Sequence, residues 1–560
     1  MESKDPETEI HPLKNEEGKA AAAAEGKGTA APGAGGLPRK AGRLSRWRTA
    51  AFFLSLFLCL LVVFAFSFII PCPVRPVSQK TWSRSYDNAA TYPFLALADV
   101  DGDGVQDVLF AFQAAAGHLD HHRRSFNGSC PEAGLASPCA FVAAHSGTNG
   151  STLWERPVGE DLLLMDCTLE LTNTPACLLI GKPDFLAALD RRTGQALWQQ
   201  VVDFGTNSTI LSPLLKIPDI NKDGVSDLLF FTSTGGKVTF LFCSGSDGRP
   251  IGASKVLHLP GCRGHLLHLT KSGALYVLFY SVTTVYAYSV EELFHMVLED
   301  HHSTALKEDP HWELTIDRTT HQLSFLSTGE ILSLAEVAKK AGASLLVARS
   351  GMLELVDGQR LGSMWVTDIP HIWREPVLGS FYPDEVDVLI ESQVSPMRKK
   401  VLMVEGASGD IEWEVELLSQ EDNPRAATLA TADHRSAFLF WGLYPENTNG
   451  TGSSEEPRPW QPQKLYLFHP SLPNVLLEMS NSSEAIVAFE GVLFEHSRHA
   501  CYVLLTGPQA GSPPGNVGLL KRKLKEDVAS SRVIWLSRLA QDSDQNIRDR
   551  FYRMRYRSLR

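Results

Sequence analysis

Cysteine and charged side chains are scarce in this chain. Its 560 residues include nine cysteines, and 21% of them are charged while 44% are hydrophobic. So few cysteines exclude a small fold held together by disulfides, and so much hydrophobic content excludes disorder throughout. Basic residues number 52 against 64 acidic ones, and the formal charge of −12 argues against a nucleic-acid binder. The 43 glycines and 32 prolines instead favour a chain with many turns, as in an all-β fold.

Motifs of several enzyme classes are also missing. The sequence contains no GxSxG, HExxH, P-loop or GxGxxG pattern, and no DxSxS motif of a ligand-binding metal site. Two histidine clusters lack companion ligands at metal-binding spacing, so we interpret them as solvated loop residues. They are His118, His121 and His122, and His301 with His302. No residue stands out as a nucleophile or general base, and we predict that the protein is not an enzyme.

One long run carries no charge at all. Residues 49–70 form 22 consecutive uncharged positions, enough for a helix to cross about 30 Å of hydrocarbon. A buried helix or a cleavable signal peptide fits less well, because Pro71, Cys72 and Pro73 follow where a cleavage site needs small residues. We therefore predict a transmembrane signal-anchor helix that places residues 49–70 in the lipid bilayer.

Basic residues crowd one side of this run. Arg75 is the only basic residue in the nine positions after it, whereas five basic residues lie just before it. Those five are Arg39, Lys40, Arg43, Arg46 and Arg48. The positive-inside rule then places residues 1–48 in the cytoplasm. The sequence predicts a single-pass type II membrane protein of the cell surface or of a secretory-pathway membrane.

N-glycosylation sequons agree with this orientation. All five lie beyond the uncharged run, on the side predicted to be extracellular or lumenal. Their asparagines are Asn127, Asn149, Asn207, Asn449 and Asn481. Each three-residue pattern is weak by itself, but their common side predicts a glycoprotein ectodomain.

Eight of the nine cysteines also lie beyond the run, an even number that suits disulfide pairing in an oxidising compartment. Short separations favour three pairs: Cys130 with Cys139, Cys167 with Cys177, and Cys243 with Cys262. Cys72 and Cys501 then remain. They pair with each other, or Cys72 bridges to another chain, or both stay free thiols; the sequence leaves these alternatives open.

Two 18-residue stretches repeat each other without a gap. They are PFLALADVDGDGVQDVLF, which begins at Pro93, and PLLKIPDINKDGVSDLLF, which begins at Pro213. Nine of the 18 aligned positions are identical. We interpret the two stretches as copies of one structural unit.

Each copy carries oxygen-bearing side chains at loop positions 1, 3, 5 and 9. The glycine after position 5 permits a sharp turn, and the backbone carbonyl of position 7 can add a ligand. Carboxylates this close repel one another without a cation, and calcium suits a flexible oxygen cage better than magnesium. We therefore predict two structural Ca²⁺ sites. The first is formed by Asp99, Asp101, Asp103, Val105 and Asp107, and the second by Asp219, Asn221, Asp223, Val225 and Asp227.

Two other readings of these loops remain. An EF-hand needs glutamate at position 12 and flanking helices, but position 12 is Phe110 or Phe230 and the flanks are short apolar runs typical of strands. An exposed acidic turn without metal is the second alternative. The stretches 93–110 and 213–230 resemble the FG-GAP repeat, the blade unit of the integrin α-subunit β-propeller. That resemblance implies a β-propeller in which the loop between two strands binds calcium.

A third, decayed copy begins at Pro376 (PVLGSFYPDEVDVLI) and lacks the first three acids, so we expect it to form a blade without metal. A second signature, glycine and tryptophan separated by three residues, occurs at Gly150/Trp154, Gly194/Trp198 and Gly409/Trp413. It is similar to the tryptophan-docking repeat of quinoprotein dehydrogenases. We expect these tryptophans to pack between neighbouring sheets.

The spacing of the repeats predicts one closed ring. The calcium loops lie 120 residues apart with one Gly/Trp unit between them, which gives blades of about 60 residues and roughly seven blades. The predicted organisation is a disordered cytoplasmic tail (1–48), the transmembrane helix (49–70), a juxtamembrane stalk (71–85), the propeller (86–515) and a basic C-terminal segment (516–560). That last segment either reaches anionic lipid or an acidic partner, or is a flexible or ring-docking terminus.

A propeller hosts enzymes and binding modules alike. The first hypothesis is a membrane-anchored protein-interaction module whose loops are stiffened by calcium. The second is an accessory subunit that assists the folding or trafficking of a membrane partner, and the third is a lumenal enzyme that uses the central channel. Converging carboxylates, histidines or arginines in that channel would favour the enzyme, and apolar side chains would favour the module.

Overall fold

The computed structural model describes most of the chain in separate stretches. These are residues 46–69, 81–115, 129–169, 174–205, 208–298, 306–323, 328–339, 342–420, 423–445, 462–494, 499–537 and 542–557. Two compact units divide the chain, Met1–Arg75 and Pro76–Arg560. Most of the predicted disordered tail and of the predicted stalk lies outside the described residues, but residues 46–48, predicted as tail, belong to a helix.

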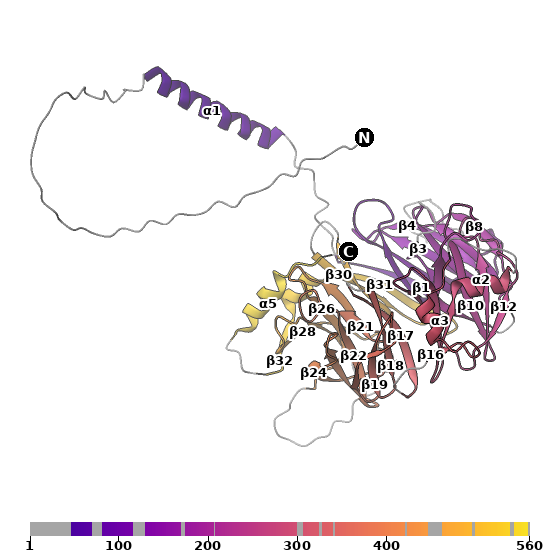
Figure 1. Ribbon diagram of the computed structural model, residues 1–560. Helices are drawn as coiled ribbons and strands as arrows, with labels where there is room; N and C mark the ends of the chain where they lie inside the picture. Colours follow the sequence, from indigo (N-terminus) through magenta and orange to yellow (C-terminus); the bar gives the residue numbers. More distant parts are fainter. Residues whose placement is uncertain are drawn as a thin grey trace, which may run out of the picture. The chain divides into compact units, whose positions relative to one another are not determined.

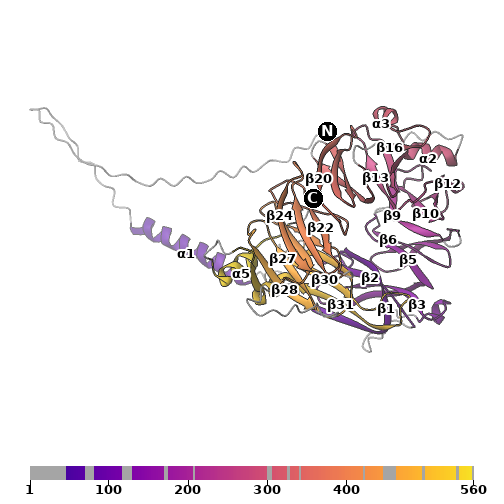
Figure 2. The ribbon, with the colours of Figure 1, turned by 90° about the horizontal axis from the view of Figure 1, so that it is seen from below.

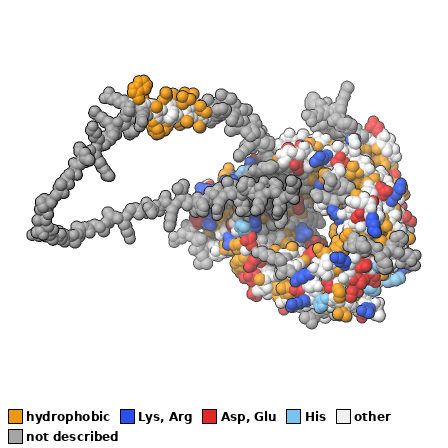
Figure 3. Space-filling model, turned by 45° about the horizontal axis from the view of Figure 1, so that its top comes forward, with side chains coloured by type: hydrophobic (Ala, Val, Ile, Leu, Met, Phe, Trp, Pro, Cys, Tyr) orange, Lys and Arg blue, Asp and Glu red, His pale blue; other side chains and the backbone are white. Residues whose placement is uncertain are grey.

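The first unit contains helix α1, Arg46–Ile69, which covers most of the uncharged run. The side chains of residues 50–64 are exposed and almost all apolar, as Figure 3 shows. Across the part of the chain that the structure describes, no helix meets the combined requirement of length and apolarity for crossing a membrane.

The second unit consists of antiparallel β-sheets set around a ring (Figures 1 and 2). Seven sheets occur among the described residues, and the largest has seven strands because its strand β1 belongs to two four-stranded groups. The described strands therefore form eight groups. The all-β, propeller-like prediction is confirmed, but the predicted count of about seven blades is not.

Groups 1 to 4 follow the chain from its first strand. Group 1 is β1 (Trp82–Ala98), β2 (Asp107–Ala114), β3 (Cys139–His145) and β4 (Thr152–Gly159). Group 2 is β5 (Asp161–Asp166), β6 (Ala176–Lys182), β7 (Phe185–Asp190) and β8 (Ala196–Val201). Group 3 is β9 (Thr209–Ile217), β10 (Asp227–Thr234), β11 (Lys237–Cys243) and β12 (Lys255–His258). Group 4 is β13 (Gly264–Leu269), β14 (Leu275–Tyr280), β15 (Val285–Ser289) and β16 (Gln322–Leu323), with helices α2 (Val290–Val297) and α3 (Pro310–Thr315) before β16.

Groups 5 to 8 complete the ring. Group 5 is β17 (Ile331–Lys339), β18 (Gly342–Arg349), β19 (Met352–Asp357) and β20 (Ser363–Asp368). Group 6 is β21 (Val377–Gly379), β22 (Asp387–Ser395), β23 (Arg398–Val404) and β24 (Ile411–Leu418). Group 7 is β25 (Ala427–Ala430), β26 (Ser436–Gly442), β27 (Gln463–Phe468), β28 (Val475–Ser482) and a fifth strand, β32 (Arg532–Trp535). Group 8 is β29 (Ile486–Phe494), β30 (His499–Thr506), β31 (Gly515–Lys523) and the first half of β1.

Hydrophobic cores lie between successive groups. Eight clusters of buried apolar side chains each join two neighbouring groups, and the series runs round the ring back to its start. A sheet in such a ring is covered on both faces, so its middle strands are buried throughout instead of alternating. Strand β3, for example, is buried at every position, whereas the outermost strand β8 is largely exposed.

Strand β1 closes the ring. Its first half pairs with β31, where Trp82 lies opposite Lys521, and its second half pairs with β2, where Ala98 lies opposite Asp107. One strand therefore holds the first and last groups together. The propeller is accordingly longer than the predicted range 86–515, because residues 82–85 and 516–523 are strand residues.

The basic C-terminal segment is docked on the ring, one of the two possibilities left open by the sequence. It forms α4 (Leu524–Ser530), strand β32 and α5 (Asp544–Tyr552). Ile547, Phe551 and Tyr556 are buried in the core between groups 7 and 8. The backbone N–H of Arg557 donates to the carbonyl of Ala430 at 2.9 Å. Burial of these apolar residues attaches the segment despite its many arginines.

The tryptophans of the Gly/Trp signature lie between sheets, as predicted. The Trp154 side chain lies against Gly194 in the next group, and its indole N–H donates to the carbonyl of Arg191 at 2.8 Å. Trp198 likewise contacts Gly248 of the group that follows. Trp413 stacks on Phe468 with ring centroids 3.9 Å apart.

Two of the three predicted disulfides are present, Cys130–Cys139 and Cys167–Cys177. The third prediction is wrong. Cys243 is buried at the end of β11, Cys262 precedes β13, and both are free thiols. Their 19-residue separation made the pair attractive in sequence, but they belong to different sheets. Cys501 is also free and buried, and Cys72 lies outside the described residues.

Candidate metal centres

The two predicted calcium loops occupy equivalent places in the ring. The first joins β1 to β2 in group 1, and the second joins β9 to β10 in group 3. Strand pairing continues to the last residue before each loop, Ala98 opposite Asp107 and Ile217 opposite Asp227. Strands instead of helices flank both loops, so the EF-hand alternative is excluded.

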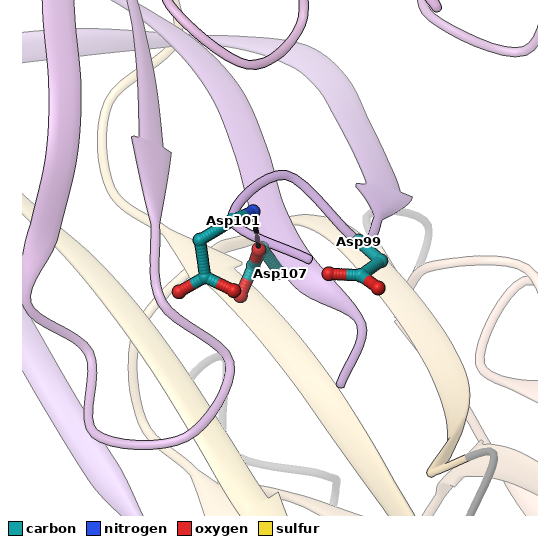
Figure 4. Close-up of side chains that lie close together, drawn as sticks. All are labelled: Asp99, Asp101 and Asp107. Atoms are coloured by element: carbon teal, nitrogen blue, oxygen red, sulfur yellow. Dashed lines mark hydrogen bonds between the residues drawn. The ribbon is translucent and has the colours of Figure 1, made fainter. Parts of the chain in front are cut away.

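The first loop folds around its own carboxylates. Asp99 accepts hydrogen bonds from the backbone N–H groups of Gly102 at 2.8 Å and Gly104 at 3.1 Å. Both glycines have positive φ, which residues with a side chain rarely adopt. One oxygen each of Asp99, Asp101 and Asp107 lie within 4.8 Å of one another, and Figure 4 shows these side chains around the turn.

Asp103 is not part of this set of three. Its two oxygens accept from the backbone N–H of Val105 and from the hydroxyl of Thr148, both at 2.8 Å. Thr148 belongs to the turn between β3 and β4, so Asp103 ties the loop to the neighbouring hairpin. The predicted role of the Val105 carbonyl remains a prediction.

The second loop repeats this arrangement. Asp219 accepts from the backbone N–H groups of Lys222 at 2.6 Å and Gly224 at 2.8 Å. Oxygens of Asp219, Asp223 and Asp227 lie within 4.8 Å of one another. Asn221 does not add a charge, and its amide donates to Asp223 at 2.9 Å. The ligand role predicted for the Val225 carbonyl likewise stays a prediction.

Two serines that the sequence reasoning did not single out complete the second loop. The hydroxyls of Ser244 and Ser246 each donate to Asp223 Oδ2 at 2.7 Å. They occupy the turn after β11, as Thr148 occupies the turn after β3. The shared signal in the sequence is a hydroxyl residue in the turn that follows the third strand, and a search for that pattern could have found all three.

The aspartate at position 9 has a structural role of its own. Asp107 accepts from the backbone N–H of Val100 at 2.8 Å and of Gly147 at 2.6 Å, and it is fully buried. Asp387, in the decayed third copy, makes the same bonds: it accepts from Phe381 at 2.7 Å and from Gly406 at 2.9 Å. Because the third loop has no acid cluster, this aspartate fastens the loop to the next hairpin without any need for a cation.

Burial and hydrogen bonding shift the pKa values of several aspartates in the two loops. Burial raises the pKa of Asp107 to about 6 and also raises the pKa values of Asp101 and Asp227. Burial would raise the pKa of Asp223 as well, but hydrogen bonds from Ser246, Ser244, Asn221 and the backbone of Val225 together outweigh it and lower that pKa to about 2. A bound divalent cation would favour the ionised form of all these carboxylates.

A buried lysine lies beside the first loop. Lys521, on β31, donates from Nζ to the carbonyl of Gln106 at 2.8 Å and is only 1% exposed. Burial lowers its pKa to about 8, although Asp107 and Asp103 oppose that effect. The last strand of the ring therefore touches the first acidic loop, and closure of the ring and the shape of the loop depend on each other.

The donor chemistry of both loops suits a hard cation. Each loop gathers carboxylate oxygens near one point, and their backbone contacts hold the turn in shape. Oxygen donors in a flexible loop are what Ca²⁺ takes. Asp99, Asp101 and Asp107 could hold one ion, and Asp219, Asp223 and Asp227 could hold a second.

The predicted glycosylation sites are only partly described. Asn149, in the turn after β3, and Asn481, at the end of β28, are both exposed. Asn127, Asn207 and Asn449 lie outside the described residues, as do the histidine clusters at 118–122 and 301–302.

A cavity of about 720 Å³ opens among the inner strands of neighbouring groups. Residues of β1 and β29 line it, among them the apolar Leu95 and Ile486 and the acidic Glu490, and most of its surface is polar. Two arginines also line it, and each is paired with a carboxylate: Arg374 with Glu391 at 3.4 Å, and Arg425 with Glu375 at 3.4 Å.

Comparisons with known proteins agree on one family. The family profile described as "FAM234A/B beta-propeller" matches residues 82–557. The chain is similar to Protein FAM234A of Homo sapiens, at 43% identity over 562 residues, and of Rattus norvegicus, at 44% over 567 residues; each alignment covers 100% of both chains. It is also similar to Protein FAM234B of Homo sapiens, at 31% identity over 520 residues, which covers 88% of this chain and 80% of that protein.

Solved structures show more distant likenesses. BamB from Moraxella catarrhalis matches with a TM-score of 0.38 and 12% identity, and the match covers 78% of this chain and 97% of BamB. Sqt1 from Saccharomyces cerevisiae matches with a TM-score of 0.41 and 11% identity over 80% of this chain and 99% of Sqt1.

Proposed function

This chain belongs to the FAM234A/B β-propeller family, and from that premise we propose that it is a membrane-anchored glycoprotein whose propeller is a calcium-binding protein-interaction module. The propeller faces the cell exterior or the secretory lumen, and residues 49–70 anchor it in the bilayer. Calcium holds two loops in shape, so that the surface offered to a protein partner is rigid before binding.

The paired acidic loops are the observation that carries this proposal. Both join the first and second strands of their groups, so the ring arrangement puts them on the same rim. Each gathers carboxylate oxygens within 4.8 Å of one another, a set of donors that suits a cation. The same features support the resemblance to the FG-GAP repeat, which remains a proposal here.

The lining of the inner cavity does not by itself decide between a binding module and an enzyme. Its two arginines are paired with carboxylates, but Glu490 also lines it and polar atoms make up most of its surface. A catalytic channel would need convergent groups that can reach a substrate. The lumenal enzyme stays an alternative, less favoured because the acidic loops support a cation-stiffened module directly.

Topology rests on the sequence features. The uncharged run at 49–70 is preceded by five basic residues, and every sequon lies beyond it. The two sequon asparagines in the described residues, Asn149 and Asn481, are exposed, as a glycosylated side chain must be. The two disulfides, one in group 1 and one in group 2, fit the oxidising environment of the secretory pathway.

Calcium-dependent capture of a partner tests the proposal. The full-length protein would be expressed in cells, crosslinked at the surface and captured in calcium or in chelator. The variant Asp99→Asn/Asp219→Asn removes one carboxylate from each loop. Its matched control is Glu385→Gln, which removes one exposed charge from the third, acid-poor loop.

We expect the same partner with the wild type and with Glu385→Gln, and loss of that partner in chelator and with the double variant. An unchanged set of captured proteins in all four samples would contradict the proposal. The accessory-subunit alternative makes a different prediction: depletion of this protein would then leave the partner immature and inside the cell.

A further inference from the structure

A polar groove runs beside one of the two described sequons. It has a volume of about 390 Å³, within the range of roughly 300–1,000 Å³ over which small-ligand pockets extend. Its wall comes from group 8 and from the turn that joins β28 to β29, and Figures 1 and 2 show β28 near β30 and β31. Asn481 itself, with Ser482 and Ser483 of the same sequon, forms part of that wall.

Strand register explains the hollow. Ser83, Leu520 and Leu504 lie opposite one another across β1, β31 and β30 and form one row on the sheet. Ser85, Gly518 and Thr506 form the next row on the same face, and Gly518 has no side chain to fill it. A Cβ at Gly518 would lie 2.7 Å from the Thr506 hydroxyl, so the hollow at this position depends on glycine.

The wall chemistry suits a sugar. Ser83, Ser85, Thr506 and Asn516 bring hydroxyl and amide groups, and Leu504 and Leu520 bring an apolar floor. The hydroxyls of Ser85 and Thr506 already donate to Asn516 and Glu484, so they can accept from sugar hydroxyls, and the Ser83 hydroxyl and the Asn516 amide group can donate to them. The apolar floor can cover an acetamido methyl group.

The sequon turn is fixed against group 8. Thr506 donates from its hydroxyl to Glu484 Oε2 at 2.7 Å, and the backbone N–H of Glu484 donates to the Ser482 hydroxyl at 3.3 Å. The turn therefore holds Asn481 at the edge of the groove, where an attached chain starts inside it.

We propose that the inner N-acetylglucosamine residues of an N-glycan on Asn481 lie in this groove and bridge groups 7 and 8. The inference rests on the proposed function, because it needs the propeller on the glycosylated side of the membrane. A glycan held in this way is shielded from processing enzymes and from glycosidases. The glycan on Asn149 starts from an exposed turn and serves as the internal comparison.

Glycopeptide mass spectrometry of the full-length protein, purified from mammalian cells, tests this at both sites. We expect oligomannose glycans on Asn481 and processed, complex glycans on Asn149. We also expect an amidase that removes N-glycans to release the Asn481 glycan from the native protein at least about tenfold more slowly, a factor that corresponds to about 1.4 kcal/mol. Denaturation should abolish that difference.

A variant that fills the groove tests whether the groove itself protects the Asn481 glycan from processing and release. Ser83 is exposed, so Ser83→Trp occupies the groove without disturbing a core, and Ser530→Trp places the same side chain on exposed α4 as a control. Ser83→Trp should leave Asn481 occupied but make its glycan processed and readily released, while Ser530→Trp changes neither property.

Equal processing and equal release at Asn481 and Asn149 would overturn the groove proposal and leave the proposed function intact. An Asn481 glycan that stays oligomannose and resistant in Ser83→Trp would also overturn it. An absence of glycan from both asparagines would instead contradict the lumenal placement on which the proposed function depends.

Discussion

Asp387 offers a direct test of the structural role that we assign to the aspartate at position 9. Its carboxylate is fully buried and accepts three backbone N–H groups, those of Phe381 at 2.7 Å, Tyr382 at 3.1 Å and Gly406 at 2.9 Å. Asp387→Ala leaves all three donors without this acceptor. Each buried donor left unpaired costs about 1–3 kcal/mol, so the loss of unfolding free energy should be at least about 3 kcal/mol.

The milder variant Asp387→Asn should cost less. Its amide carbonyl can still accept from Phe381 and Tyr382, but its NH₂ group then faces the N–H of Gly406, so we expect a loss of about 2 kcal/mol. Unfolding entropy of about 2.1 cal/mol/K per residue means that a ring spanning residues 82–557 loses roughly 1 °C of melting temperature per kcal/mol. Denaturant titration is therefore the more sensitive assay.

Urea unfolding of both variants, each with calcium and with chelator, distinguishes the stability that comes from the hydrogen bonds of Asp387 from stability that depends on bound metal. The losses at Asp387 should be the same in the two buffers, because the third loop has no acid cluster. Glu385→Gln is the control for removal of a nearby charge and should change stability by less than about 0.5 kcal/mol. A loss below about 1 kcal/mol for Asp387→Ala, or a loss that appears only in calcium, would refute the reasoning.

Three further predictions concern other parts of the ring. Asp101→Asn gives the first loop the residue that the second loop carries at Asn221, and we expect it to weaken calcium binding roughly tenfold, because the charge of the ligands tunes affinity. Asn221→Asp makes the reverse change and should tighten binding at the second loop roughly tenfold. Titration calorimetry measures both affinities. Burial lowers the pKa of His265 to about 4, below the unfolded value near 6.5, so the stability of its neutral form is complete above about pH 6.5 and is lost as pH falls toward 4. His265→Gln keeps a donor for the carbonyl of Pro213 but cannot take up a proton, so the loss of stability between pH 7 and pH 4 should be about 3 kcal/mol smaller than in the wild type. Urea titrations at pH 7 and pH 4 measure this loss, and an equal loss in the variant and the wild type would contradict the role of His265. Gly194→Ala should lower the free energy of unfolding by at least about 1 kcal/mol more than Gly205→Ala does. Both glycines have positive φ, but only a Cβ at Gly194 would meet Trp154, at 2.4 Å. Equal losses in urea titrations would mean that the tryptophan contact is unimportant.

The repeat, through its resemblance to the FG-GAP blade unit, predicted the propeller. Spaced acids, a turn glycine and a following apolar strand recur at 93–110 and 213–230, and the structure places both stretches at the same corner of their sheets. The Gly/Trp pairs correctly predicted packing between sheets, but Trp154 and Trp198 each contact the glycine of the following group, Gly194 and Gly248 respectively. The signature is local, whereas the contact that it makes joins residues about 40 to 50 positions apart.

Features that depend on distant residues could not be predicted in the same way. The predicted count of about seven blades is not confirmed. Group 8 takes a strand from the start of the chain, and nothing local in β31 indicates β1 as its partner. The pairing of Cys243 with Cys262 was wrong because short separation says nothing about which sheet each strand joins. Lys521 was missed for the same reason: 414 residues separate it from Asp107, whose loop it touches.

Within the candidate metal sites, the sequence predicted most of the acids that cluster, but it also included Asp103, which lies outside the first set of three. Asp103 bonds to Thr148 of the neighbouring turn, and Asp107 fastens two hairpins together. Such roles depend on a turn about 40 residues downstream, so spacing inside the loop cannot reveal them. The third copy, which keeps Asp387 without the other acids, makes the two roles separable.

Calorimetric titration of calcium into the purified full-length protein, treated with chelator beforehand and kept in detergent, counts the ions bound by the two loops. We expect two bound ions per chain, one ion with either Asp99→Asn or Asp219→Asn, and none with the double variant, while Glu385→Gln still binds two. Absence of binding at millimolar calcium, or the same stoichiometry in the wild type and the double variant, would contradict this expectation.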